Sequence, residues 1–371
     1  MTDPRLGRRC ANAGAGRSSV RLLVGVVVVL AVVIPVIAAR NRSSHPHGDG
    51  PPAATTTTAP RGLGPVNVGE IGSMSFVDAN QGYGVEADRY LVHSGDGGQT
   101  WRRVHTLPAG DRYVQVAPDR PAYFGGLVVW GDGPLSQSSD GGAHWHATLG
   151  PSVSALSEAS FRLWASVACG RAGPSPCAPR VATSVDGGRT WRDARTSPRL
   201  GSGAQSVATP SGNTVYLVDG DYAWTPDGGK SWAYESLPAG CATRPVHHLA
   251  VQADASLLAC SPSPQLGVGT QAFVSLDQGR SWRAAPLPSQ DTISGVTVSG
   301  TDSGFVVASI VGPLLVTSDR GHSWHPAFRV GSHTAIRGID REYGIGVWVA
   351  AEDQGIWFSP DGAHWEQRAS A

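Results

Sequence analysis

The sequence is poor in charged residues. They make up 16% of its 371 residues, Lys230 is the one lysine, and the formal net charge is zero. Residues 1–42 hold seven arginines and one acid, which leaves 22 basic and 28 acidic residues in the rest of the chain, a net charge of about −6. Domains that bind nucleic acid usually carry clustered basic residues. The lack of such a cluster after residue 42 therefore argues against a nucleic-acid partner.

Common enzyme and metal-site motifs are absent as well. The sequence has neither the G-x-S-x-G turn of serine hydrolases nor the H-E-x-x-H helix of zinc proteases. Its cysteines lack the spacing of zinc sites, and adjacent residues such as His247 and His248 point to opposite faces of a strand. We therefore expect neither a metal site nor a cofactor.

Long runs of helix-forming residues are also scarce, whereas turn-forming residues are abundant. The chain contains 48 glycines, 27 prolines and 12 tryptophans. Such a composition is typical of all-β domains built from short strands.

One long hydrophobic run lies near the N-terminus. Residues 22–39, LLVGVVVVLAVVIPVIAA, are uncharged and would span about 27 Å as a helix, enough to cross the hydrocarbon core of a membrane. Five arginines precede the run and two follow it, which favours a cytoplasmic N-terminus. We predict a cytoplasmic basic segment over 1–21, a transmembrane anchor over 22–39, a linker rich in Pro, Thr and Ala over 40–63, and an exported domain over 64–371. A cleaved signal peptide ending at Val36-Ile37-Ala38, with a secreted product, is the alternative.

Export changes the interpretation of the cysteines. Cys10 lies in the predicted cytoplasmic segment, and Cys169, Cys177, Cys241 and Cys260 lie in the exported domain. Four cysteines in an oxidising compartment indicate two disulfide bonds. The short separations favour Cys169–Cys177 and Cys241–Cys260, although all three connectivities stay open from the sequence.

A short motif recurs seven times after residue 90. The copies are SGDGGQTW, SSDGGAHW, SVDGGRTW, TPDGGKSW, SLDQGRSW, TSDRGHSW and the shortened SPDGAHW, and their tryptophans are 41 to 50 residues apart. Each interval contains runs of β-branched and aromatic residues between Gly, Asp and Pro, as expected for four strands. Repeats of this length indicate a propeller or a repeat array. We predict an all-β, seven-bladed β-propeller of four-stranded blades, with GPVNVG at residues 64–69 as a candidate extra strand where the ring closes.

Each residue type of the motif has an expected structural role. The aspartate accepts backbone N–H bonds within the turn, the glycines allow positive φ, and the tryptophan is buried against the sheet. If Trp191 is buried in this way, Trp191→Ala should cost about 3–5 kcal/mol. One carboxylate per turn is too few for a calcium site. The predicted structural residues are Ser94, Asp96, Trp101, Ser138, Asp140, Trp145, Ser184, Asp186, Trp191, Thr225, Asp227, Trp232, Ser275, Asp277, Trp282, Thr317, Asp319, Trp324, Ser359, Asp361 and Trp365.

The motif resembles the Asp-box, also called the BNR repeat, S/T-x-D-x-G-x-T/S-W. Asp-boxes occur in sialidases, sortilin-type receptors, some glycoside hydrolases and the photosystem II assembly-factor propellers. Seven copies over residues 70–371, together with SFVDANQGYGV at 75–85, make the chain similar to the assembly-factor group. The resemblance implies a seven-bladed ring with a binding role. It also implies functional loops on the face opposite the boxes, where the Cys169–Cys177 segment and residues 261–271 are the most elaborate.

An exo-acting, sialidase-like glycosidase is the enzymatic alternative. The resemblance to sialidases implies an Arg-Ile-Pro motif, but the nearest phrase here is FRLW at 161–164, and no Tyr–Glu pair is recognisable. We therefore assign no catalytic residue. The acids Glu86, Asp88, Glu352 and Asp353 lie near predicted turns between second and third strands, where a pair suited to glycoside hydrolysis could converge.

The sequence thus predicts a membrane-anchored, monomeric propeller outside the cytoplasm, in a bacterial cell envelope. Its expected role is non-catalytic binding or assembly. The expected partner is a protein or an envelope glycan.

Overall fold

The computed structural model describes residues 63–117, 126–169, 178–201, 204, 206–242, 246–252, 255–261, 269–288, 293–298, 304–309, 313–327, 336–342 and 345–371. All of them belong to one compact unit that comprises residues 58–371. The predicted segment 1–21, the predicted anchor 22–39 and the linker up to residue 62 lie outside the described residues. Within the described ranges, no helix is both long enough and apolar enough to cross a bilayer.

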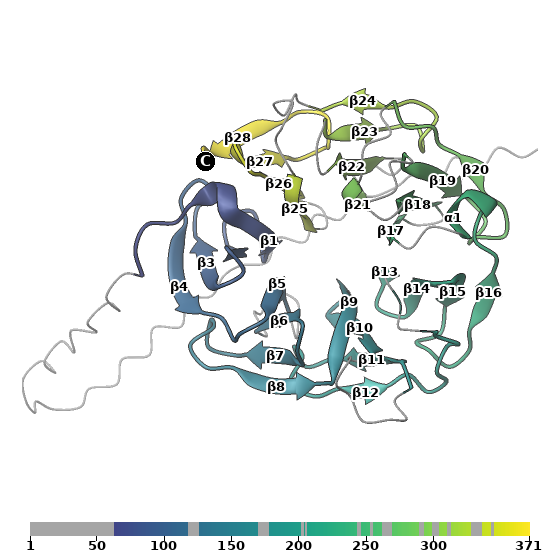
Figure 1. The fold of residues 1–371 in the computed structure, drawn as a ribbon, viewed down its shortest axis with the longest axis horizontal. Coiled ribbons are helices and arrows are strands. Elements are labelled where there is room, and N and C mark those ends of the chain that lie inside the picture. The colour runs from purple at the N-terminus through teal and green to yellow at the C-terminus, as the bar shows by residue number, and fades with distance from the viewer. Residues whose placement is uncertain are drawn as a thin grey trace, which may run out of the picture. The chain divides into compact units, whose positions relative to one another are not determined.

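The described residues form seven four-stranded antiparallel sheets, which are the blades of a ring (Figure 1). In each blade the strands follow one another in chain order, with the first strand innermost and the fourth at the rim (Figure 1). The predicted all-β, seven-bladed propeller of four-stranded blades is therefore confirmed.

The strands are best named by their position in a blade. The first strands are β1 (Ile71–Phe76), β5 (Asp111–Val116), β9 (Ser152–Ala159), β13 (Ser206–Ser211), β17 (Val246–Gln252), β21 (Ile293–Val298) and β25 (Ile336–Glu342). The second strands are β2 (Gly82–Glu86), β6 (Leu127–Gly131), β10 (Arg162–Ala168), β14 (Thr214–Asp219), β18 (Ala255–Ser261), β22 (Phe305–Ser309) and β26 (Gly346–Ala351). The third strands are β3 (Tyr90–Ser94), β7 (Leu135–Ser138), β11 (Arg180–Ser184), β15 (Asp221–Thr225), β19 (Gln271–Ser275), β23 (Leu315–Thr317) and β27 (Gly355–Ser359). The fourth strands are β4 (Arg102–Thr106), β8 (His146–Leu149), β12 (Arg192–Asp193), β16 (Ala233–Glu235), β20 (Arg283–Ala284), β24 (His325–Pro326) and β28 (Glu366–Ala369). Two short helices are described, the 3₁₀ helix η1 (Val68–Glu70) and α1 (Ala239–Ala242).

Position in the blade explains the composition of each strand. A second strand is covered on both faces by neighbouring blades, so it is apolar without alternation, and every residue of β26 (GVWVAA) is buried. A fourth strand forms the rim, and β4 (RRVHT) is exposed or half-buried along its length. The buried apolar side chains gather into clusters, each between two adjacent blades. The core of the molecule is therefore a circle of blade interfaces rather than one central cluster.

The ring closes between the first and seventh blades. Each of these blades is one continuous stretch of chain, so no strand is exchanged between the two ends of the domain. Phe76 of β1 stacks on Trp348 of β26 with ring centroids 4.0 Å apart. The N–H of Phe76 also donates to the Asp340 carboxylate of β25 at 2.8 Å. Closure thus depends on packing and hydrogen bonds between complete blades.

The expectation of an extra strand at residues 64–69 is wrong. Residues 63–67 are coil, and Val68–Glu70 form η1. A Cβ placed on Gly69 would lie 2.1 Å from the carbonyl oxygen of Glu352. The segment therefore packs its backbone against the turn after β26, where it has no free strand edge with which to pair.

A disulfide bond joins Cys241 in α1 to Cys260 in β18, with Cα atoms 5.3 Å apart. It is one of the two pairings that the cysteine spacing favours. Both residues are fully buried, in the cluster between the fourth and fifth blades. Cys169 is also disulfide-bonded, but Cys177, its expected partner, lies outside the described residues, as does Cys10.

Candidate functional site

The recurring turn joins the third strand of each blade to the fourth. In the first copy, the Ser94 hydroxyl donates to Asp96 Oδ1 (2.9 Å) and accepts from the Gly98 N–H (2.8 Å). The Asp96 carboxylate also accepts from the N–H and the hydroxyl of Thr100, at 2.9 and 2.6 Å. Trp101 Nε1 donates to the Gly98 carbonyl at 3.0 Å. The hydroxyl-to-aspartate bond is present in the seven copies of the motif.

These bonds favour the ionised carboxylate. In the fourth copy, the hydroxyl and then the N–H of Ser231 hold the pKa of Asp227 well below its ordinary value, and the Thr225 hydroxyl adds to this effect. In the second copy a histidine takes the place of the second hydroxyl residue, and His144 Nδ1 lies 2.6 Å from Asp140. Each carboxylate is therefore engaged by its own turn. In the part of the chain that the structure describes, no group of three or more His, Cys, Asp or Glu side chains could hold a metal ion.

The seven motif tryptophans are half-buried, so they are less enclosed than the buried position against the sheet that we expected. Each precedes an outermost strand, where the rim leaves one side of the indole ring in contact with solvent. The fully buried tryptophans are instead Trp164 of β10 and Trp348 of β26, which lie on second strands. The burial of a tryptophan in this protein therefore depends on how deep in the blade it lies. Membership of the motif does not determine it.

The recurring turns, residues 95–101 and their equivalents, lie on the same face of the ring as the hairpins between first and second strands. This follows from the meander, because first and third strands run in the same direction. The Gly97 N–H donates to the Asn80 carbonyl at 2.8 Å, and the Gly228 N–H donates to the Asn213 carbonyl at 2.9 Å, each between these two kinds of turn. We call this side the repeat-turn face.

The turns between second and third strands form the opposite face with the connections between blades. Of the loops that we expected to be functional on that face, residues 170–177 and 262–268 lie outside the described residues.

Glu86, one of the acids considered for a glycosidase pair, ends β2 on this face and is fully buried. Its two carboxylate oxygens bond Arg103 at 2.6 and 2.7 Å, and one also accepts the Asn67 N–H at 2.6 Å. Glu86 is thus a structural anchor for the segment before β1. The other candidate acids are at the surface: Asp88, Asp353 and Glu352, which pairs with Arg337.

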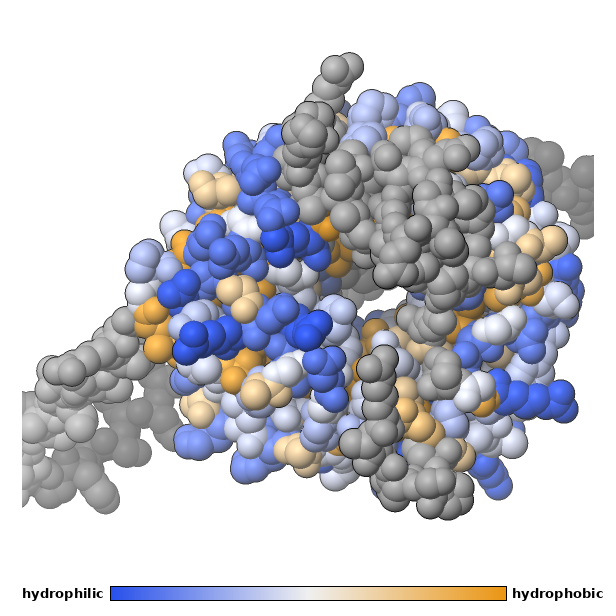
Figure 2. Space-filling model, in the orientation of Figure 1, coloured by the Kyte–Doolittle hydropathy of each residue, from blue (hydrophilic) through white to orange (hydrophobic). Residues whose placement is uncertain are grey.

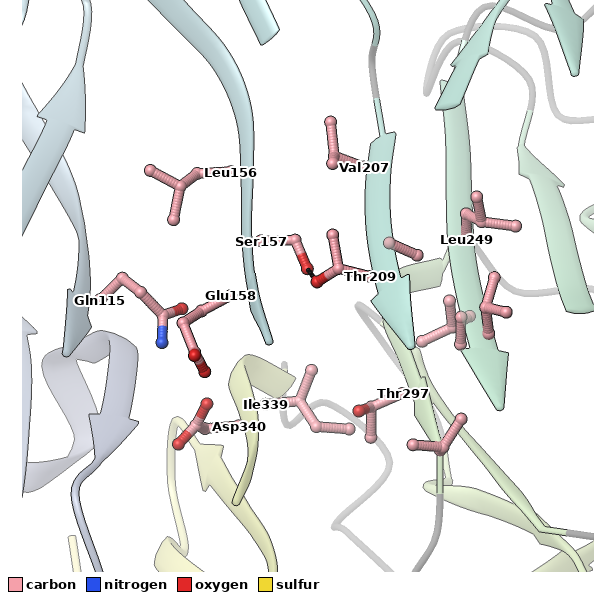
Figure 3. A pocket seen from close by; sticks show the side chains of 15 residues that line it. Gln115, Leu156, Ser157, Glu158, Val207, Thr209, Leu249, Thr297, Ile339 and Asp340 are labelled. Carbon is pink, nitrogen blue, oxygen red and sulfur yellow. Dashed lines mark hydrogen bonds between the residues drawn. The ribbon is translucent and has the colours of Figure 1, made fainter. Parts of the chain in front are cut away.

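A cavity of about 250 Å³ lies among the first strands of six blades, on the axis of the ring. The ring is open at its centre (Figure 2), and the cavity wall comes mainly from the C-terminal halves of β5, β9, β17, β21 and β25 and from residues 207–209 of β13 (Figure 3). These strand ends lead into the hairpins of the repeat-turn face, so the cavity lies toward that face. Nine of the fifteen residues that line the cavity are apolar, but most of the surface that they and their neighbours present to the cavity is polar. The polar side chains that line it are Gln115, Ser157, Glu158, Thr209, Thr297 and Asp340.

Glu158 links this cavity to a strained hairpin. Ser160 and Phe161, between β9 and β10, have φ values of +52° and +64°, which residues other than glycine seldom adopt. The Phe161 N–H donates to Glu158 Oε1 at 2.9 Å, so the carboxylate fixes the hairpin. Burial raises the pKa of Glu158, although the Phe161 N–H acts in the opposite direction. The Phe161 side chain itself is exposed.

Asp340 and Gln115 face the same cavity from other blades (Figure 3). Asp340 accepts the Phe76 N–H and therefore also holds the seventh blade to the first. Gln115 Nε2 donates to Ser75 Oγ at 3.0 Å and to the Val116 carbonyl at 3.2 Å. Both amide protons thus have partners on the protein, which leaves Oε1 as a hydrogen-bond acceptor.

Sequence reasoning did not find this site. Glu158 and Asp340 are far apart in the sequence, and neither belongs to the recurring motif. One signal was present, because Gln115, Glu158 and Asp340 each place a polar side chain near the C-terminal end of a first strand. Three such residues in three repeats indicate a polar zone on the axis, once the repeats are arranged in a ring.

The histidine pair of β17 lies outside the cavity wall. His247 Nε2 is 3.3 Å from the Cys241 carbonyl, whereas His248 bonds the backbone of Ile293 in the next blade. The two rings therefore contact different neighbours. Burial lowers the pKa of His248 to about 4, so this side chain is neutral at physiological pH.

No family model matches this sequence, and no curated protein matches it either. Solved structures share its fold. An ancestral GH74 enzyme is 14% identical with a TM-score of 0.64, over 82% of this chain and 47% of the enzyme. YCF48 bound to the D1 peptide is 18% identical with a TM-score of 0.55, over 77% of this chain and 91% of YCF48. The chain thus spans about half the length of the GH74 enzyme, and its similarity to both proteins is one of fold.

Proposed function

We propose that this chain is a non-catalytic, protein-binding propeller held outside the cytoplasm by an anchor at residues 22–39. The observation that carries the proposal is the axial cavity, whose two acids both have structural bonds. Glu158 fixes the Ser160–Phe161 hairpin, and Asp340 fixes the closure of the ring. Acids that already hold parts of the scaffold in place are suited to a preformed recognition surface on a rigid scaffold.

The proposal extends to the recurring turns and to the kind of partner. We propose that the turns are Asp-boxes, because the hydrogen bond from the Ser/Thr hydroxyl to the aspartate recurs in the seven copies and a half-buried tryptophan follows each of them. The binding of a peptide by YCF48, which has a similar fold, supports a protein partner more directly than an envelope glycan. The cavity lies toward the repeat-turn face, so we propose docking on this face in place of the opposite face that the sequence resemblance implied.

Site-specific photocrosslinking in membranes tests this function. The full chain would carry a photoreactive phenylalanine analogue at Phe161, on the repeat-turn face, or at Asp353, on the opposite face. We expect a discrete protein adduct from position 161 and a weaker one or none from position 353. Absence of an adduct at position 161, or the same adducts from both positions, would contradict docking on the repeat-turn face.

Glycoside hydrolysis is the second candidate function. The raised pKa of Glu158 suits a general acid, and the GH74 enzyme shares the fold. A panel of fluorogenic glycosides, including a sialoside, should give no hydrolysis with the full chain. Turnover that Glu158→Gln abolishes would replace the non-catalytic proposal with an enzymatic one.

A further inference from the structure

The axial cavity presents a mostly polar surface that includes hydrogen-bond acceptors, although many of the residues behind it are apolar. Leu156, Val207, Leu249 and Ile339 contribute to its apolar part, and Glu158 brings a carboxylate. None of the described residues that line the cavity is Arg, Lys or His. A ligand group rich in N–H donors would complement such a wall.

The acceptors are arranged around one point of the wall. Glu158 uses Oε1 to accept the Phe161 N–H, and among the described residues it forms no ion pair, so its second oxygen is available. The Gln115 amide donates its two protons to Ser75 Oγ and the Val116 carbonyl, so its Oε1 is available as a hydrogen-bond acceptor. The two side chains approach the same space from β5 and β9 (Figure 3).

We propose that the axial cavity receives the guanidinium group of an arginine side chain from the partner protein. This inference rests on the proposed protein-binding function. Guanidinium is planar, always charged, carries five N–H donors and accepts nothing, so it matches a site formed of a carboxylate and an amide oxygen. The cavity is smaller than the 300 Å³ or more of typical small-molecule pockets, which suits a single side chain.

The partial burial of the Glu158 carboxylate favours an arginine. A half-buried carboxylate without a cation is costly, and a bound guanidinium would offset that cost through charge-assisted hydrogen bonds. Lysine offers a compact, strongly hydrated charge and would gain less here.

Titration of the purified full chain with small probes tests the inference. The probes are N-acetylarginine amide, N-acetyllysine amide and N-acetylcitrulline amide, the last of which is nearly isosteric with the first but uncharged. We expect saturable binding of the arginine probe in the millimolar range and binding of the citrulline and lysine probes that is weaker by roughly tenfold or more. Equal affinity for arginine and citrulline, equal affinity for arginine and lysine, or no saturation by the arginine probe would each overturn the proposal.

Two variants locate the binding. Glu158→Gln should weaken the arginine probe by roughly tenfold or more, whereas Asp353→Asn removes the same charge on the opposite face and should leave the affinity unchanged. An equal effect of both variants would overturn the assignment to the cavity. If Glu158→Gln does not fold, the comparison of arginine with citrulline on the unmodified chain still decides the question.

The two proposals fail in different ways. A crosslinked partner at position 161 without binding of the arginine probe would remove the arginine assignment and leave the protein-binding function intact. Probe binding without any crosslinked protein would instead remove the proposed function.

Discussion

At the scale of single residues, the aspartate of each recurring turn forms its hydrogen bonds within its own turn. Asp186 accepts hydrogen bonds from Ser184 and Thr190, all within one turn. The tryptophan that follows is half-buried, because it stands at the rim of the blade. A residue on a second strand has neighbouring blades on both sides and is more deeply enclosed. Local hydrogen bonds therefore shape the turn, while the depth of a residue decides how much its side chain contributes to stability.

Two tryptophans of the third blade provide a direct comparison. Trp191 of the motif is half-buried, and Trp164 of β10 is fully buried. We expect Trp164→Ala to lower the free energy of unfolding by about 3–5 kcal/mol and Trp191→Ala by about 2 kcal/mol, because less surface is removed from water at the rim. Denaturant-induced unfolding measures both. Equal losses would show that depth in the blade is not the deciding factor.

Asp111 should make stability depend on pH. It begins β5, is 3% exposed, and its Oδ2 has no hydrogen-bond partner among the described residues. Burial raises the pKa of Asp111 from 3.8 to about 6. The folded state therefore holds a proton that the unfolded chain releases near pH 3.8, and this contribution to stability is lost as the pH rises through 6.

Asp111→Asn removes that dependence, because asparagine has a similar shape and never ionises. We expect the variant to be more stable than the unmodified chain by about 3 kcal/mol near pH 7.5 and close to equal near pH 4. Unfolding curves at the two pH values test this, with Asp132→Asn as an exposed control. A stability difference that does not change with pH would contradict the assignment.

At the scale of elements, the first strands are joined from blade to blade by side-chain hydroxyl groups. Ser75 Oγ accepts the Val116 N–H at 3.0 Å, and Ser206 Oγ accepts the Leu249 N–H at 3.1 Å. The disulfide between α1 and β18 adds a covalent link near the outer part of the fifth blade. Neighbouring blades are thus held by polar bonds at the axis as well as by apolar packing.

The Cys241–Cys260 bond should contribute to stability through the loop that it closes. The two residues are 19 apart in sequence, and loops of this size are associated with about 3 kcal/mol. We expect the double variant Cys241→Ala/Cys260→Ala to lose about that much free energy of unfolding, whereas Cys10→Ala should lose none. Unchanged stability of the double variant would mean that the unfolded chain is not constrained by this link.

At the scale of the whole molecule, the closure of the ring is a seam like the other blade interfaces but without a covalent connection. Phe76 and Trp348 stack across it, and Trp348 Nε1 donates to the Gly97 carbonyl at 3.3 Å. The other blade interfaces are also bridged by the continuous chain. We therefore expect the seam between the first and seventh blades to open before any other interface.

Trp348→Ala should open that seam selectively. Hydrogen exchange in β1 and β25 should become faster by a larger factor than in β13 and β17, because the seam loses its stacked pair. Trp164→Ala removes an equally buried tryptophan from the third blade and serves as the control. Uniform acceleration of exchange around the ring would contradict a weak seam.

The recurring motif predicted the blades because its hydrogen bonds are local. Ser94, Asp96 and Trp101 lie within one turn, so their spacing alone identifies the end of a third strand. The half-burial of the tryptophans could not be predicted, since it depends on how far the next blade extends. Glu86 looked like a surface acid at a turn, but Arg103 and Asn67 reach it from other segments.

The axial cavity was beyond prediction for a related reason. Glu158 and Asp340 meet only because the ring brings the third and seventh blades to one axis. The sequence separation of such pairs is fixed by the number of blades between them, and no short pattern records it. The number of repeats predicts a ring with a central axis. Which side chains come together on that axis can be known only from the three-dimensional structure.

Because each blade is one uninterrupted stretch of chain, the ring has no privileged starting point. The C-terminal Ala371 lies beside Gly69, where a Cβ added to the glycine would be 3.4 Å from the Cβ of Ala371. A short peptide could therefore join the two ends of the domain, and new ends could be opened between any two other blades. Circular permutants of this kind would keep all seven sheets whole and would move the seam to a chosen interface.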